Sequence, residues 1–214
     1  MSLAIVTLIL AEPYVHDVLI SKIEAKYGPF AKNRFVYLNK VMAEAKDKSE
    51  KDKLRIINDF YNNVRYRSDL KNYKLKDYWA SPIEFLGRDR GDCEDYVIAK
   101  YFALKHLGVD TQKLYFTYVK STKFKQPHMV LTYFETPNSI PLVLDNFNYK
   151  IFPANKRTDL IPVYNFNGDN LFIAQKSGLG KRVEQKKSYK QWDLLLEKIQ
   201  RNQIWHFLDN WHYY

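Results

Sequence analysis

The order of local sequence patterns predicts an α+β fold, in which a helical lobe precedes an antiparallel sheet and one further helix. Apolar residues recur at helical spacing as far as Gly108. After Gly108 the chain changes to short segments rich in β-branched and aromatic residues, a pattern typical of strands. The 214 residues, 46% of them hydrophobic, can form one domain with a real core. We therefore expect a single domain over 1–214, with a helical lobe at about 1–108, a sheet lobe at about 109–175 and a C-terminal helix at about 189–202.

The helical lobe is predicted to contain four helices. Gly28 and the proline after it end the first, and Ser49 opens the third with Asp52 in a capping-box-like position. The segment 66–90 is polar and is expected to be irregular. In the fourth helix, Lys100 and Lys105 are expected to face solvent. The predicted ranges are 15–27, 31–46, about 49–64 and about 92–107.

The sheet lobe is predicted from alternating β-branched and aromatic residues. A basic loop is expected at 178–187, followed by the amphipathic C-terminal helix. The predicted strands are 114–120, 129–134 and 142–146, with further candidates at 161–166 and 171–174.

Charge and hydropathy exclude several classes of function. The net charge is +10, but the lysines are scattered and no RNA- or DNA-binding signature is present. We therefore expect no nucleic-acid partner, and an acidic protein partner or substrate explains the charge at least as well. The apolar run 5–10 lacks a basic flank and is too short to span a bilayer, so a trimmed export signal, an artificial start and a buried first segment all remain open.

Cys93 is the only cysteine and a candidate nucleophile. It falls at the start of the fourth helix, where unpaired backbone N–H groups and the helix dipole favour an anion. Both effects stabilise a thiolate, and the same N–H groups can hold the oxyanion of a tetrahedral intermediate. The alternative is a small buried hydrophobic residue, which is the common role of a free cysteine.

His128 and Asp145 are the candidate partners of Cys93. His128 begins one predicted strand and Asp145 ends another, so the two side chains meet if these strands are antiparallel neighbours. Asp145 would then orient the imidazole. The alternatives are a structural histidine and a strand-end aspartate; the other histidines lie within a helix or near the chain ends.

Three acidic residues surround the candidate nucleophile. Asp92, Glu94 and Asp95 are all favourable in a helical first turn, which is sufficient to explain them as caps. Three carboxylates would nevertheless oppose ionisation of the thiol. A calcium ion held by carboxylate oxygens would cancel this effect, although the chain contains no EF-hand-like loop.

Three motifs resemble those of the LapG-type bacterial transglutaminase-like cysteine proteases. They are GDCEDY at 91–96, QPHMVL at 126–131 and PLVLDN at 141–146. The flanking segments DYWASP at 77–82 and RTDL at 157–160 agree, and the resemblance extends from about 53 to 166.

This resemblance implies a papain-like or transglutaminase-like fold and cysteine endopeptidase activity. By position, Cys93 corresponds to the nucleophile, His128 to the general base and Asp145 to the orienting acid. Asp92 and Glu94 correspond to calcium ligands, and Asp95 is a further candidate.

The resemblance also implies a periplasmic location, although the chain shows no export signal. Members of this family cleave a giant surface adhesin near its N-terminus, typically at an Ala-Ala pair, which disperses biofilm. They are held in check by an inner-membrane receptor of the LapD type that senses cyclic di-GMP.

Two alternatives to a protease remain open at this point. The same triad can serve a transglutaminase or an amidase, because it determines acyl chemistry and not the acceptor. The fold can also persist as a non-catalytic binding module, although the intact triad argues against this. Trp79 is a candidate for the second oxyanion donor, or else a packed aromatic residue.

Overall fold

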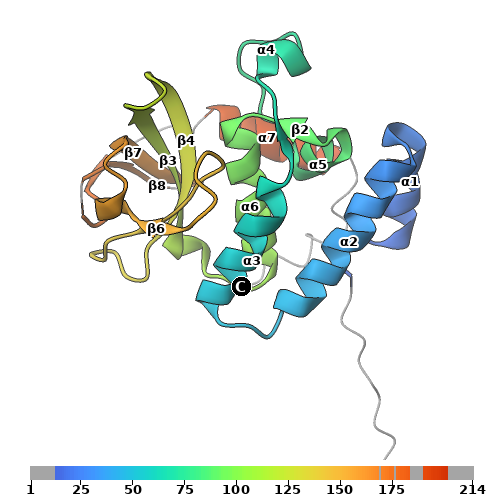
Figure 1. Ribbon diagram of the computed structural model, residues 1–214, viewed down its shortest axis with the longest axis horizontal. Helices are drawn as coiled ribbons and strands as arrows, with labels where there is room; N and C mark the ends of the chain where they lie inside the picture. Colours follow the sequence, from blue (N-terminus) through green and yellow to red (C-terminus); the bar gives the residue numbers. More distant parts are fainter. Residues whose placement is uncertain (1–12, 169, 176, 184–189, 202–214) are drawn as a thin grey trace, which may run out of the picture.

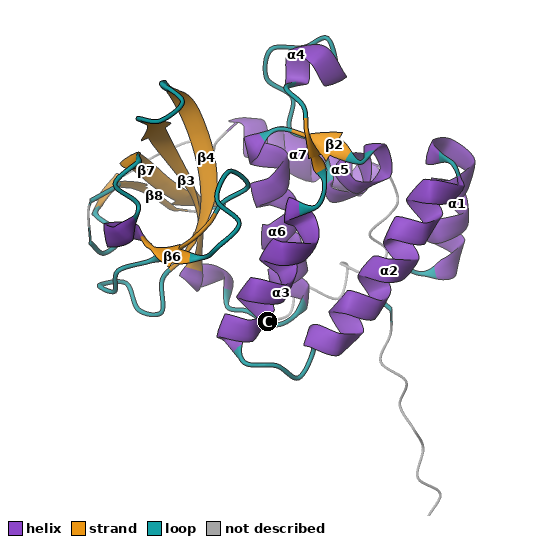
Figure 2. Ribbon diagram, viewed as in Figure 1, coloured by secondary structure: helices purple, strands orange, loops and turns teal. Residues whose placement is uncertain are grey.

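The computed structural model describes residues 13–168, 170–175, 177–183 and 190–201, and it confirms the α+β prediction. The helices lie on one side of the molecule and the larger sheet on the other, with α6 near the boundary and α1 and α2 farthest from the sheet (Figures 1 and 2). The helices are α1 (Asp17–Tyr27), α2 (Pro29–Ala45), α3 (Glu50–Asn62), α4 (Asp69–Asn72), α5 (Pro82–Arg88), α6 (Cys93–His106) and α7 (Lys190–Arg201).

The larger sheet has seven strands in the order β6-β5-β4-β3-β7-β8-β9, and every neighbouring pair is antiparallel. A second sheet pairs β1 with β2 in parallel. The strands are β1 (Arg65–Tyr66), β2 (Arg90–Gly91), β3 (Leu114–Ser121), β4 (Gln126–Tyr133), β5 (Leu142–Leu144), β6 (Phe152–Pro153), β7 (Leu160–Asn167), β8 (Asn170–Ile173) and β9 (Lys181–Val183).

Helix α6 lies in the centre of the hydrophobic core. All ten residues from Asp95 to Leu104 are buried, because α3 and α5 pack on one part of the helix surface and β4 on another. The prediction that Lys100 faces solvent is therefore wrong: its exposed fraction is 1%. Lys105, nearer the end of the helix, is half-buried.

The predicted helices and strands are confirmed to within a few residues at their ends, with two exceptions. The segment 66–90 is not irregular, since it contains α4 and α5. Helix α5 begins with a capping box in which Ser81 and Glu84 satisfy each other's backbone N–H groups. The predicted basic loop contains β9, while residues 184–187 of that loop lie outside the described part of the chain.

Within the described residues, the structure contains no helix that is both long and apolar enough to cross a membrane. The apolar run 5–10 lies outside the described residues.

Candidate active site

The first turn of α6 is held in place by buried backbone contacts. One carboxylate oxygen of Asp95 accepts the Ala80 N–H at 2.8 Å, and the other accepts the Asp92 N–H at 3.2 Å. Gly91 makes this geometry accessible, because a Cβ at this position would lie 2.3 Å from the Asp95 Oδ2 atom. The carboxylate of Asp95 therefore ties the residue before Cys93, and the segment before α5, to the first turn of α6.

Cys93 is the first residue of α6, as predicted, and its side chain is partly buried. The backbone of Met129, the residue that follows His128, acts to lower the pKa of this thiol. The thiol donates to the Glu94 Oε2 atom at 3.1 Å. Burial raises the pKa of the thiol well above its usual value, and the charges of Glu94 and Asp92 raise it further.

His128 and Asp145 meet at the edge where β4 and β5 separate. The strands are antiparallel with Leu131 opposite Leu144, so continuing this register puts Asp145 opposite Val130, two residues from His128 on the same face. The His128 Nε2 atom lies 2.8 Å from the Asp145 Oδ1 atom, and both side chains are almost completely buried. This leaves Nδ1 of the imidazole for proton exchange with a nucleophile.

The ring of Phe147 supports the imidazole from one side. It stacks on His128 with centroids 4.4 Å apart and planes 11° from parallel. The backbone N–H of Phe147 also donates to the Asp145 Oδ1 atom at 3.0 Å. Phe147 thus contacts both members of the pair.

Arg157 compensates the buried charge of Asp145 and was not identified from the sequence as a functional residue. Its Nη2 atom donates to the Asp145 Oδ2 atom at 2.7 Å, and Asp159 accepts from the same guanidinium. Burial opposes ionisation of Asp145, but the hydrogen bonds from His128, Phe147 and Arg157 outweigh it and lower its pKa to about 2. In the sequence, the RTDL motif at 157–160 was the available indication of this role, because a buried carboxylate requires a cationic partner.

A second cluster of carboxylates lies beside Cys93. Ligand oxygens of Asp69, Asp92 and Glu94 all lie within 4.8 Å of one another. Asp69 is 23 residues before Asp92 in the chain and was missed by sequence reasoning. It is brought to the site by the pairing of β1 with β2, which places the start of α4 beside the start of α6. Asp95, a predicted ligand, is not a member of this cluster, since its oxygens accept the backbone N–H groups described above.

The negative charges of this cluster are poorly compensated, and the pKa values of its carboxylates are raised. Burial raises the pKa of Asp69 to about 7 and that of Glu94 to about 7. Burial, followed by the charge of Glu94, raises the pKa of Asp92 to about 8. Among the described residues, Asp69 and Asp92 each have one buried Oδ1 atom without a hydrogen-bond partner. Such oxygens suit a hard cation, which prefers carboxylate ligands.

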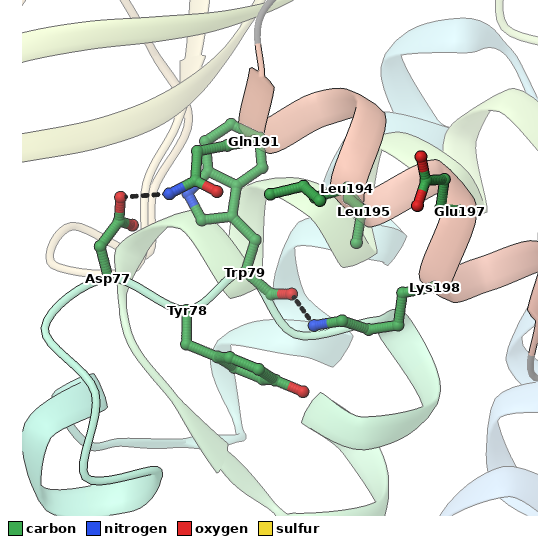
Figure 3. A pocket seen from close by; sticks show the side chains of 8 residues that line it. All are labelled: Asp77, Tyr78, Trp79, Gln191, Leu194, Leu195, Glu197 and Lys198. Carbon is green, nitrogen blue, oxygen red and sulfur yellow. Dashed lines mark hydrogen bonds between the residues drawn. The ribbon is translucent and has the colours of Figure 1, made fainter.

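The C-terminal helix supports the segment behind this cluster (Figure 3). Gln191 donates to Asp77 at 2.6 Å and Lys198 donates to the Trp79 carbonyl at 2.7 Å, on either side of a cavity of about 450 Å³. The intervening Tyr78 N–H donates to Asp69. Trp79 itself is a buried aromatic residue of the core, packed nearly parallel to the ring of Phe116.

Comparison with known proteins identifies one family. The model of the bacterial transglutaminase-like cysteine proteinase family matches residues 35–160. Calcium-bound Legionella pneumophila LapG is 38% identical, with a TM-score of 0.73 over 84% of this chain and 97% of that one. EGTA-treated Legionella pneumophila LapG is 36% identical, with a TM-score of 0.74 over 87% of this chain and 99% of that one.

A search of curated protein sequences gave no significant match. The family match covers more than half of the chain, and the structural similarity extends over almost the full length of each LapG chain. The chain therefore belongs to the bacterial transglutaminase-like cysteine proteinase family.

Proposed function

We propose that this protein is a calcium-dependent periplasmic cysteine protease that cleaves the N-terminal region of a large surface adhesin, at an Ala-Ala pair, and so promotes biofilm dispersal. Cys93, His128 and Asp145 act as its catalytic triad. The observation that carries the proposal is the joint geometry of two neighbouring groups: a buried His128–Asp145 pair at 2.8 Å and an uncompensated acidic cluster at the nucleophile.

The arrangement of the triad supports acyl chemistry. The Cys93 thiol gives its proton to His128 and its sulfur attacks the scissile carbonyl carbon, so that a C–S bond forms and the C=O double bond opens to an oxyanion. The backbone N–H groups at the start of α6, where Cys93 is the first residue, would stabilise this oxyanion. His128 then gives its proton to the amide nitrogen, the C–N bond breaks, and water hydrolyses the thioester with His128 as the base.

The acidic cluster supports calcium binding. Asp69, Asp92 and Glu94 would hold the ion, because their oxygens lie together. The Oδ1 atoms of Asp69 and Asp92 are buried and have no hydrogen-bond partner in the part of the chain that the structure describes. When bound, calcium supplies positive charge that favours the ionised forms of the cluster and of the nearby thiol. Glu94 would then serve as a ligand instead of accepting the hydrogen bond from the Cys93 thiol, and His128 would be the base for that thiol.

The location, substrate and partners rest on the family. The matched LapG structures were obtained with calcium bound and after EGTA treatment. We propose by analogy a periplasmic location and sequestration by an inner-membrane, LapD-type receptor that senses cyclic di-GMP. The net charge of +10 is compatible with an acidic substrate segment.

The test is gel-resolved cleavage of the N-terminal region of a candidate adhesin from the same organism. Wild type is incubated with calcium or with excess chelator, and Cys93→Ala is incubated with calcium. We expect cutting only by wild type with calcium. Cutting by Cys93→Ala would exclude Cys93 as the nucleophile, and full activity in chelator would exclude the calcium requirement.

The same samples separate proteolysis from acyl transfer. If wild type incorporates a primary amine into a glutamine-containing acceptor faster than it hydrolyses the adhesin, the enzyme is a transglutaminase. If neither reaction occurs but iodoacetamide labels Cys93 rapidly, the triad is retained and the proposed substrate is wrong.

A further inference from the structure

A lysine and two asparagines are buried together beneath the active site. Lys100 lies on α6, and Asn58 and Asn62 lie on α3; their exposed fractions are 1%, 0% and 2%. The Lys100 Nζ atom donates to the Oδ1 atoms of both asparagines, each at 2.8 Å. Lys100 is seven residues beyond Cys93, about 10 Å along the helix, so it does not touch the reacting atoms.

The ammonium group determines which way both carboxamides face. A lysine has three N–H donors and no acceptor, so it can only contact the oxygen of each carboxamide. The NH₂ groups of Asn58 and Asn62 are consequently turned away from Lys100. An apolar residue at position 100 would fill the space but would leave two buried oxygens unpartnered and both carboxamides free to flip.

The two NH₂ groups hold the loop that carries the active-site carboxylate. Asn62 Nδ2 donates to the backbone carbonyl of Asp145 at 2.9 Å, and Asn58 Nδ2 donates to that of Tyr149 at 2.8 Å. Between these points lies Phe147, whose ring stacks on His128 and whose N–H contacts the Asp145 carboxylate. Both supports of the imidazole therefore belong to a loop anchored at each end by one asparagine.

We propose that Lys100 is a positioning residue, which orients Asn58 and Asn62 so that the loop 145–149 holds His128 in its catalytic orientation. The inference rests on the proposed function of His128, but the positioning itself can be measured without a substrate. Burial lowers the pKa of Lys100 to about 7, whereas Asp145 and Asp59 act to raise it.

The main test is the NMR resonance of the proton bonded to the His128 ring carbon Cε1. This resonance is assigned as the one that disappears in His128→Gln. Stacking on Phe147 shifts this resonance through the ring current. In Lys100→Met we expect it to move, because the loop loses its anchors. Lys105→Met, on the same helix but half-buried, is the matched control and should leave the resonance unchanged.

Asn62→Asp provides a second variant in case Lys100→Met does not fold. It keeps an acceptor for Lys100 and removes the donor to the Asp145 carbonyl, so the same shift is expected. Asn58→Asp loses only the bond to Tyr149 and should have a smaller effect. An unchanged His128 resonance in folded Lys100→Met or folded Asn62→Asp would overturn the proposal.

Kinetics then separate positioning from packing. Lys100→Met should lower kcat by about 10- to 100-fold with KM within about twofold of wild type, since misplacement of a catalytic group affects the chemical step. Because the two residues act in series, adding Asn62→Asp to Lys100→Met should cause little further loss. A lowered melting temperature with wild-type kcat would mean that Lys100 only packs. If wild type cuts no adhesin but the His128 resonance moves as expected, the positioning stands and the proposed substrate falls.

Discussion

The two halves of the active site differ in how their charges are compensated. On the sheet side, Asp145 contacts His128 and Arg157, and its pKa falls to about 2. On the helix side, no ion pair from a described lysine or arginine reaches Asp69 or Asp92, and the pKa values of these two carboxylates rise to about 7 and about 8. Asp145 is more deeply buried than Asp92 and yet has the lower pKa, so burial alone does not explain the difference.

The difference shows which part of the site the protein completes by itself. The sheet side contains a preorganised acid–base pair, and the positive charge that compensates Asp145 comes from Arg157 of the same chain. The helix side contains negative charge that the folded chain leaves without a partner, which is the arrangement expected of a cation site. Substitutions on the two sides should consequently respond differently to calcium.

The largest effect is expected on the sheet side, for Asp145→Asn. The amide can still contact His128 but cannot stabilise its charged form, so kcat should fall by roughly 10²- to 10⁴-fold in a folded protein. Steady-state cleavage with saturating calcium measures it. Added calcium should not rescue this variant, and a wild-type rate would remove Asp145 from the triad.

On the helix side, Asp69→Asn should weaken calcium binding by at least about tenfold, because one of three charged ligands is lost. Isothermal titration with calcium measures the affinity. The same variant should be more stable than wild type in chelator, since it relieves repulsion. Asp77→Asn is the matched control, because Asp77 contacts Gln191 at the surface. Equal affinity in Asp69→Asn and wild type would exclude Asp69 as a ligand.

Asp95→Ala should separate scaffolding from metal binding. Loss of the acceptors for the Ala80 and Asp92 N–H groups should lower the free energy of unfolding by about 1–3 kcal/mol. Chemical denaturation measures this change. Calcium affinity should fall less than in Asp69→Asn; a larger fall would make Asp95 a direct ligand, as the resemblance suggested.

The smallest effect is the pH dependence of stability, which should have opposite signs on the two sides. The raised pKa values of Asp69, Asp92 and Glu94 mean that, without calcium, stability is lost as the pH rises from about 4 to about 8. The lowered pKa of Asp145 contributes stability above pH 4 that is lost as the pH falls through about 2.

Melting temperatures between pH 5 and pH 8 test the helix-side slope. Without metal the melting temperature should fall across this range, and calcium should raise it most at pH 8, where the carboxylates are ionised. Asp69→Asn should flatten the metal-free slope. A calcium-induced shift that is the same at pH 5 and pH 8 would contradict this assignment.

Local sequence patterns were sufficient for most of the fold and for half of the site. Cys93 is placed by its own neighbours, because a helix start depends on capping residues within a few positions. His128 and Asp145 could be paired because both lie at the ends of strands that neighbour each other in the chain. The short helix α5 was not predicted, although Ser81 and Glu84 form a capping box, because the segment around it is polar.

What the sequence determined by itself was the α+β order, the helix-start cysteine and the candidate His–Asp pair, since each depends on local periodicity or capping. Only the tertiary structure brought Asp69 to the acidic cluster, placed Arg157 against Asp145 and buried Lys100 beneath the site. The contacts of Asp69 and Arg157 join segments that are distant in the chain. Lys100 is buried because other elements pack on several sides of its helix. Their geometry follows from how the elements pack, and no local pattern encodes it.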